Sequence, residues 1–313
     1  MTNCEHFRFL SSDGKTQLHG CIWTPEEKIK FRGVLQIAHG VAEHIERYDD
    51  FARFLNSQGI VVAGHDHLGH GKSLPQGGTP VYFGQGNTWN TVVDDIYVLH
   101  QRLLQKYPDT PLCIMGHSMG SFLTRTYLIR YPGTVKAAVI MGTGWQPHAV
   151  ITGGLAVADA VIALKGENAT SDVVTELAFG AYNKMFAPNR TKVDWLSADE
   201  SNVDDYIADP LCGADATVGL FRQMLHGLRF NQRQSNLRRM DADTPVLFVA
   251  GDKDPVGSCG KGVIQSCEAF RAAGVRDCTL KLYPGLRHEI LNEKPQRDQI
   301  TQDIETWLLS RLP

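Results

Sequence analysis

A chain of 313 residues is long enough to bury a core without disulfide bonds or metal ions to hold it together. Hydrophobic residues make up 42% of it and charged residues 21%, a balance that excludes a disordered chain. The formal net charge of −3 favours neither nucleic acid nor an anionic membrane as a partner, so we expect a small-molecule substrate and no nucleic acid.

The cysteines and the first residues of the chain indicate in which compartment of the cell the protein is expected. Seven cysteines are scattered without a CxxC pair, and the odd number argues against a closed disulfide framework. The first residues, MTNCEHFRFLSSDG, lack the basic and apolar regions of a secretory signal. No window of 18 apolar residues is apparent, and the longest low-charge stretch, residues 153–164, is too short to span a bilayer. We expect a cytoplasmic protein in which that stretch contacts lipid transiently or lines an apolar pocket.

Short apolar runs alternate with longer segments of helical periodicity in the first part of the chain, which is typical of βαβ units and a mainly parallel sheet. The expected strands cover residues 34–38, 60–63, 111–115 and 137–141. Helices are expected from about Ile45, over residues 89–107 and around Phe122.

The same alternation returns near the C-terminus. Strands are expected over residues 246–250 and 280–283, and a last helix begins at about Pro295, a residue suited to a first helical turn. The residues that this helix is expected to bury are Ile300, Ile304, Trp307 and Leu308. Between about Trp145 and Asp243 the alternation stops and aromatic residues are frequent, which indicates an insertion between two strands.

We therefore predict an α/β fold with a mostly parallel central sheet, helices on both faces and an inserted, mainly helical cap. The first part of the core covers residues 1–144, the cap 145–243 and the second part of the core 244–313. Insertions at the carboxyl edge of a parallel sheet lie over the usual ligand crevice, so the cap is a candidate lid.

Ser118 is the candidate nucleophile. It lies in the sequence Gly116-His117-Ser118-Met119-Gly120, a GxSxG motif that by itself is weak evidence. Here the motif follows an apolar strand and precedes a helix, the arrangement that lifts a serine hydroxyl above the sheet edge. The glycines suit a turn in which neighbouring backbone comes too close for a Cβ atom.

A serine nucleophile needs a base, and the base needs an acid that orients it. His288 is the candidate base because it follows the last strand in a loop, whereas its competitor His226 lies in the insertion. Asp254 is the candidate acid, since it lies three residues past the strand-ending Gly251, and Asp252 is expected to brace that loop. The backbone amides of Met119 and Val41 are the candidate donors to the oxyanion.

Five segments together resemble a known family: HGVAEHIERY from His39, HDHLGHGKS from His65, GHSMGS, GDKDP and YPGLRHE. They are similar to the monoacylglycerol lipase and lysophospholipase group of the α/β-hydrolases, in the wider serine aminopeptidase-like superfamily. The resemblance covers roughly residues 18–142 and 246–312. It implies a triad of Ser118, Asp254 and His288, oxyanion amides at Val41 and Met119, a lid over an acyl pocket and hydrolysis of single-chain lipid esters.

Three points stay open in the sequence. His65, His67 and His70 form an HxHxxH cluster similar to the HxHxDH signature of metal-dependent hydrolases, but Gly69 stands where that signature needs Asp, and no other cluster completes a metal site. The aromatic residues of the cap either contact the ligand or pack a small core. Glu43 and His44 either shape the pocket or stabilise the loop that carries Val41.

The function expected is hydrolysis of a carboxylic ester with an acyl chain, without a cofactor or metal ion. An amidase or aminopeptidase with the same triad is the alternative, and a metal-dependent hydrolase at His65, His67 and His70 is a weaker one. The residues expected to line the substrate pocket are His39, Gly40, His117, Trp145, Phe179, Phe186, Phe221 and Met224. The sequence leaves the oligomeric state, the natural ester and any motion of the lid open.

Overall fold

The computed structural model describes residues 3–312 and contains one sheet in the strand order β1-β2-β4-β3-β5-β6-β7-β8. The strands are β1 (Asn3–Leu10), β2 (Gln17–Thr24), β3 (Gly33–Ala38), β4 (Ile60–His65), β5 (Leu112–His117), β6 (Ala138–Met141), β7 (Val246–Gly251) and β8 (Cys278–Tyr283). From β4 to β8 every pair is parallel, whereas β1 and β2 form an antiparallel hairpin that joins β4 at the edge of the sheet. The mostly parallel sheet is confirmed.

The central strands are buried on both faces, which explains why they are apolar at every position. In β3, Val34 and Ala38 point into one apolar cluster and Leu35 and Ile37 into the other, because successive side chains of a strand face opposite sides. The parallel register places the carboxyl ends of these strands together, with Ala38 opposite Gly116. Side chains that follow these strands therefore gather at one edge of the sheet.

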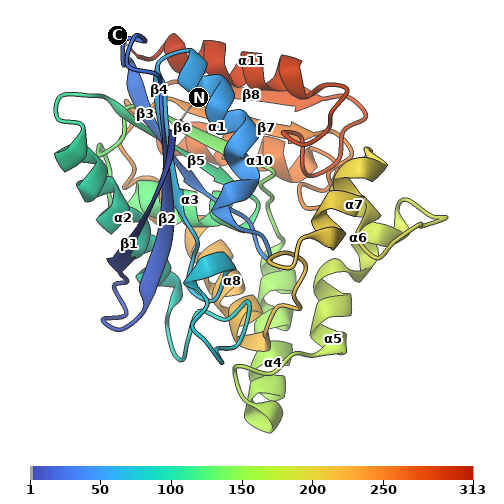
Figure 1. Cartoon of the computed structure of the whole chain (residues 1–313). Helices are drawn as coiled ribbons and strands as arrows, with labels where there is room; N and C mark the ends of the chain where they lie inside the picture. The colour runs from blue at the N-terminus through green and yellow to red at the C-terminus, as the bar shows by residue number, and fades with distance from the viewer. Residues whose placement is uncertain (1–2, 313) are drawn as a thin grey trace.

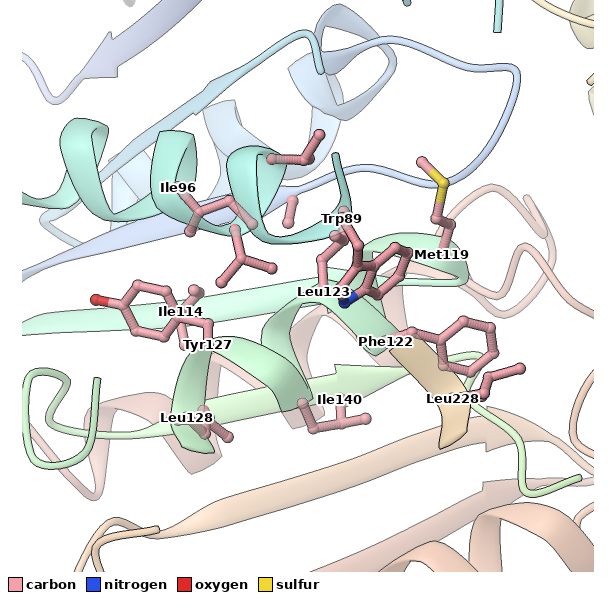
Figure 2. Close-up of a cluster of buried hydrophobic side chains, with 14 of the residues drawn as sticks. Trp89, Ile96, Ile114, Met119, Phe122, Leu123, Tyr127, Leu128, Ile140 and Leu228 are labelled. Carbon is pink, nitrogen blue, oxygen red and sulfur yellow. The ribbon is translucent and has the colours of Figure 1, made fainter. Parts of the chain in front are cut away.

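Helices cover both faces of the sheet (Figure 1). One face is covered by α1 (Asp49–Ser57) and α11 (Arg297–Leu309), and the other by α2 (Trp89–Lys106), α3 (Met119–Arg130) and α10 (Lys261–Ala273). Figure 2 shows the core around α3, where Leu123 lies beside the Trp89 ring at the start of α2. Trp89 also donates a hydrogen bond from its indole nitrogen to Thr126 Oγ1, at 3.0 Å. This packing holds the N-terminus of α3 firmly at the sheet edge.

The segment between β6 and β7 is mainly helical. It contains α4 (His148–Lys165), α5 (Asp172–Thr175), the π-helical turn η3 (Glu176–Gly180), α6 (Ala181–Lys184), the 3-10 turn η4 (Asp194–Leu196), α7 (Glu200–Ala208), α8 (Val218–Asn231) and α9 (Gln234–Leu237). The helices α4 to α7 stand away from the sheet (Figure 1), whereas α8 packs against both α3 and α4. The inserted segment and the core therefore share one apolar cluster.

Three expectations need correction. The helix α4 has 18 residues with a mean hydropathy of 1.5, so a segment long and apolar enough to cross a membrane does exist, although length and composition alone are weak evidence that it does so. The last helix begins at Arg297 and not at Pro295, because residues 294–296 form a turn that precedes it. Its Trp307 is only half-buried. The hairpin of β1 and β2 extends the sheet beyond the expected strands.

Candidate active site

Ser118 lies in a sharp turn between β5 and α3. Its φ and ψ of 54° and −122° fall in a region that side chains rarely adopt, and the packing around it must offset that strain. A Cβ atom on Gly116 would lie 2.3 Å from the carbonyl oxygen of Gly120, and one on Gly120 would lie 2.0 Å from the carbonyl oxygen of Ala38. Both glycines are therefore required for the turn to pack against β3.

His288 and Asp254 form a buried pair. The imidazole Nδ1 of His288 lies 2.9 Å from Asp254 Oδ2, and the two residues are 2% and 0% exposed. Asp252, the other candidate acid, accepts a hydrogen bond from the amide of Gly285 at 2.8 Å and so braces the loop that precedes His288. His226 lies in α8 and contacts Arg229 instead. Ser118 and His288 line the same cavity.

The backbone around Val41 lies against the turn of Ser118. A Cβ atom on Gly40 would lie 3.0 Å from the Cβ of Ser118, so the loop approaches this closely only because residue 40 is glycine. Val41, Ser118 and Met119 line one cavity. Within residues 3–312, the amides of Val41 and Met119 donate to no other group, which leaves both available to an oxygen atom beside Ser118.

Glu43 holds this loop in place. Its Oε1 accepts hydrogen bonds from the amide of Gly40 at 2.6 Å, the hydroxyl of Tyr48 at 3.0 Å and Nδ1 of His117 at 3.1 Å. Burial alone would raise the pKa of Glu43, but His117 and Arg47 outweigh it and hold the pKa well below its usual range. Burial would likewise lower the pKa of His117, and the Glu43 carboxylate raises it above its usual value. Glu43 therefore stabilises the loop, and it also lines a cavity beside Ser118, so both of the roles left open by the sequence apply to it.

The network continues to the loop of His288. Arg47 donates to Glu43 Oε2 at 2.9 Å and to both oxygens of Glu289 at 2.8 Å. His117 Nε2 lies 3.3 Å from the carbonyl oxygen of His288. Breaking a buried ion pair of this kind costs about 3–5 kcal/mol, because one charge is left without a partner. The segments that carry Val41 and His288 are thus joined by buried charges.

The inserted segment is also attached to the His288 loop. The carbonyl oxygen of Leu196 accepts from the amides of His288 at 3.0 Å and Glu289 at 2.8 Å. Asn202 of α7 donates its side-chain amide to Glu289 Oε2 at 2.9 Å. Arg287 donates to the carbonyl oxygen of Ser197 at 3.0 Å. These bonds fix residues 196–202 of the insertion to the core.

Two cavities meet at Ser118. One has a volume of about 500 Å³ and an almost entirely apolar wall, built largely from α4 and α8. Its wall includes Phe122, Val157, Val174, Leu177, Phe179, Phe221, Met224, Leu225 and Leu228. The other, of about 520 Å³, is more polar. Its wall includes Gly40, Glu43, His117, Lys192, Asp215, His288 and Glu289.

The expected pocket residues divide into two groups. Gly40, His117, Phe179, Phe221 and Met224 line these cavities. His39, Trp145 and Phe186 are outside the described walls of both.

Each of these three residues has other partners. His39 is buried beneath the loop, where Nε2 accepts from the amide of His67 at 3.0 Å. Trp145 lies beside the Arg125 guanidinium, 5.8 Å from its ring centroid, and Phe186 beside Arg287, at 3.9 Å. Some aromatic residues of the insertion therefore line the cavities beside Ser118, whereas others pack against neighbouring residues.

Trp195 was missed by the sequence analysis. Its ring lies 5.2 Å from the His288 ring and 5.9 Å from the Phe179 ring, and it lines both cavities. It belongs to the short turn η4, so no helical or strand periodicity marked it as a wall residue.

His65, His67 and His70 are buried together with His39 at the end of β4. Burial lowers the pKa of His65 and of His70 to about 3, so both imidazoles are neutral at physiological pH. The rings of His65 and His67 lie 5.1 Å apart at right angles to each other. Within residues 3–312, these three side chains are not among the groups whose ligand atoms converge within 4.8 Å of one another. The geometry gives the metal-dependent alternative no support.

Comparison with known proteins agrees with this geometry. A model of the family described as serine aminopeptidase, S33, matches residues 29–295. The monoacylglycerol lipase of Mycolicibacterium smegmatis is 32% identical over 292 residues, which is 93% of this chain and 92% of that protein. The monoglyceride lipase of Mus musculus is 27% identical over 293 residues, 93% of this chain and 86% of that protein.

A solved structure agrees over almost the whole chain. A thermostable carboxyl esterase from Bacillus coagulans, in complex with glycerol, has a TM-score of 0.90 and 28% identity and covers 98% of each chain. The match thus includes the sheet, both helical layers and the inserted segment. This chain belongs to the serine aminopeptidase S33 family of α/β-hydrolases, in the group of serine hydrolases that contains the monoacylglycerol lipases.

Proposed function

We propose that this protein hydrolyses carboxylic esters of a single acyl chain, such as monoacylglycerols or lysophospholipids, through an acyl-enzyme on Ser118. The observation that carries the proposal is the position of Ser118 between an apolar cavity of about 500 Å³ and a more polar one. An ester of this class has an apolar acyl chain on one side of its carbonyl carbon and a polar alcohol on the other. The relatives named monoacylglycerol lipase support the same substrate class.

In the proposed reaction Ser118 Oγ attacks the ester carbonyl carbon while His288 Nε2 takes its proton. Asp254, bonded to Nδ1, keeps the imidazole in the tautomer that presents Nε2 to the serine and stabilises the imidazolium. The negative oxygen of the tetrahedral intermediate accepts hydrogen bonds from the amides of Val41 and Met119. His288 then protonates the leaving alcohol, and a water molecule, deprotonated by His288, releases the fatty acid from Ser118.

Glu43 and His117 act through the backbone in this scheme. Glu43 holds the Gly40 amide at 2.6 Å, which fixes the direction of the next amide, that of Val41. His117 lies between Glu43 and the carbonyl group of His288. Both are therefore positioning residues that set the distance between the oxyanion donors and the base.

The exposed surface of the insertion supports transient contact with lipid aggregates, which we propose as part of the function. Only 17% of the residues of α4 are buried. Apolar side chains on α4 and the neighbouring α5 and η3 are exposed: Val150 by 54%, Leu164 by 86%, Val173 by 61% and Leu177 by 67%. Since α4 also forms the wall of the apolar cavity, a lipid held at this surface would be close to the cavity.

The expected cytoplasmic location stays a proposal. All seven cysteines are free, as in proteins of reducing compartments.

Labelling with a fluorophosphonate probe tests the nucleophile. We expect the probe to label the native protein and to leave Ser118→Ala unlabelled, because only an activated serine reacts with it. Ser121→Ala is the matched control, since Ser121 is a buried serine of the same helix that donates to the carbonyl oxygen of Ser118. Equal labelling of Ser118→Ala and the native protein would contradict the assignment.

A substrate series tests the ester class against the amidase alternative. We expect nitrophenyl esters with longer acyl chains to be hydrolysed faster than an aminoacyl nitroanilide, because the apolar cavity accommodates a chain. A peptidase would need an acidic side chain to bind the substrate ammonium group. In the wall of the polar cavity Glu43 and Glu289 are both engaged by Arg47, which leaves Asp215 as the acidic residue for that role. Faster cleavage of the nitroanilide would favour the aminopeptidase alternative.

A further inference from the structure

A second group of chemically reactive side chains lies on the N-terminal hairpin. His6 of β1 is paired directly with Cys21 of β2, and His19 lies two residues before Cys21 on the same face of that strand. Glu46 belongs to the 3-10 turn η1 (Ile45–Tyr48), which packs against β2. The four residues are spread over the first 46 positions, so no local spacing in the sequence indicated that they meet. The sequence analysis therefore did not detect this cluster.

One atom of each side chain lies at a corner of a small tetrahedron. His6 Nδ1 is 3.0 Å from His19 Nε2 and 3.4 Å from Cys21 Sγ. His19 Nε2 and Cys21 Sγ are 3.9 Å apart. Glu46 Oε1 lies 3.5 Å from His6 Nδ1, 3.7 Å from His19 Nε2 and 3.9 Å from Cys21 Sγ. A tetrahedral zinc ion with bonds of about 2.0–2.3 Å separates its ligands by about 3.3–3.8 Å. Three of the six observed separations fall within that range, and the other three lie within 0.3 Å of it, at 3.0 and 3.9 Å.

The surroundings orient these atoms as in a metal site. His19 Nδ1 bonds to Asp66 Oδ2 at 2.9 Å, which directs its Nε2 toward the other three ligands. Asp66 is itself held by the amides of Ile45 and Lys72, both at 2.8 Å. Cys21 and His19 are buried, whereas the His6 side chain is 50% exposed and provides a path for entry.

Lys72 is the competing partner in this cluster. Its ammonium group lies 2.5 Å from Glu46 Oε1, so an ion has to share or displace this contact. The Lys72 side chain is 43% exposed, and such a surface ion pair contributes only a small stabilisation that coordination can replace.

We propose that His6, His19, Cys21 and Glu46 bind one divalent ion of borderline softness, with zinc as the best match. Two imidazoles, a thiolate and a carboxylate around a tetrahedral position are a donor set that zinc prefers. On binding, Cys21 loses its thiol proton to solvent, and no electron is transferred. Three of the four ligands precede the stretch of residues 29–295 that the family model matches.

The role of the ion is structural. It joins the hairpin of β1 and β2 to η1, and η1 begins two residues after Glu43, the residue that holds the loop of Val41. Binding to the folded protein stabilises it in proportion to the logarithm of the free ion concentration.

Cobalt substitution tests the site. The full-length protein is freed of metal with a chelator and titrated with Co²⁺, which reports a thiolate ligand through an ultraviolet charge-transfer band and tetrahedral geometry through intense visible bands. We expect one cobalt ion per chain with both signals, and loss of both when Zn²⁺ is added. In Cys21→Ser the charge-transfer band should disappear.

Two variants keep the test decisive. Cys212→Ser is the matched control, because His44, Asp209 and Cys212 form the other group of converging ligand atoms within the described residues. Loss of the band in Cys212→Ser but not in Cys21→Ser would overturn the proposal, as would a titration without either signal. His6→Gln, at the exposed edge, should fold normally and weaken Zn²⁺ binding at least ten-fold, so that Zn²⁺ raises its Tm less than that of the native protein. An equal rise in Tm for both would also overturn it.

Discussion

The strand ends around Ser118 and the inserted segment above them are built in opposite ways. At the sheet edge the polar side chains are buried and bonded, with Glu43, Asp254 and His288 no more than 4% exposed. In the insertion, α4 presents most of its surface to solvent. In the function proposed above, the sheet edge fixes the geometry of the reaction, whereas the insertion selects the substrate through apolar surface. Each prediction below separates these two contributions.

The largest effect is expected from the acid at the sheet edge. Asp254→Asn removes the charge that orients His288, and comparable substitutions lower kcat by about 10⁴-fold. Asp252→Asn is the control, because Asp252 bonds to the Gly285 amide and lies outside the pair; its kcat should stay within a few-fold of the native value. Steady-state kinetics on one nitrophenyl ester measures both. If Asp252→Asn caused the larger loss, the two aspartates would exchange roles.

A smaller effect is expected from Glu43. In Glu43→Gln a neutral amide oxygen replaces the carboxylate that accepts hydrogen bonds from Gly40, Tyr48 and His117. These bonds become weaker, so the loop of Val41 is held less firmly. Loss of one oxyanion donor typically costs about 10²–10³-fold in kcat, and a loosened donor should cost about ten- to a hundred-fold. KM should change little because the apolar cavity is untouched. A change confined to KM would contradict the positioning role.

The third prediction concerns the insertion alone. Val157 of α4 lines the apolar cavity, and Val157→Phe shortens the space for an acyl chain. We expect kcat/KM for a dodecanoyl ester to fall by about ten-fold while the butanoyl ester is unaffected. Ile207→Phe, in the wall of the polar cavity, is the matched control and should leave the dependence on chain length unchanged. Equal losses for both esters in Val157→Phe would mean that the acyl chain lies elsewhere.

The smallest effect is on the pH dependence of stability. The pKa of His117 in the folded protein is raised by the Glu43 carboxylate, despite burial. Its contribution to stability is therefore complete below the unfolded pKa of about 6.5 and is lost as the pH rises through the folded pKa. The difference in Tm between the native protein and His117→Gln should be largest near pH 6 and shrink toward alkaline pH. A difference in Tm that stayed constant with pH would contradict the coupling of His117 to Glu43.

The sheet edge could be anticipated from sequence because each of its features has a local signature. The turn at Ser118 needs Gly116 and Gly120, and Asp254 and His288 lie in the loops after β7 and β8, three and five residues past the strand ends. The buried network of Glu43, Arg47 and Glu289 could not be predicted from the sequence, because Arg47 and Glu289 are 242 positions apart and meet only in the folded chain.

The insertion was harder to predict because most of its helices are short and the apolar residues face different partners. Phe179 lines the cavities while Phe186 packs on Arg287, although both are aromatic residues of one segment. Periodicity does not distinguish a side chain that faces a cavity from one that faces another element. The wall residue Trp195 lies in a 3-10 turn too short to carry any period.

The hydrogen bonds of the Leu196 carbonyl group limit how the enzyme can open. Because this oxygen holds the amides of both His288 and Glu289, a swing of residues 196–202 would drag the catalytic base out of alignment with Ser118. If the proposed lipid substrate requires the insertion to open, the movement would have to come from α4 to α6, which among the described residues donate no backbone hydrogen bond to the His288 loop. In that arrangement substrate would enter on the apolar side while His288 keeps its position beside Ser118. Substrate entry and catalysis would then depend on different segments of the insertion.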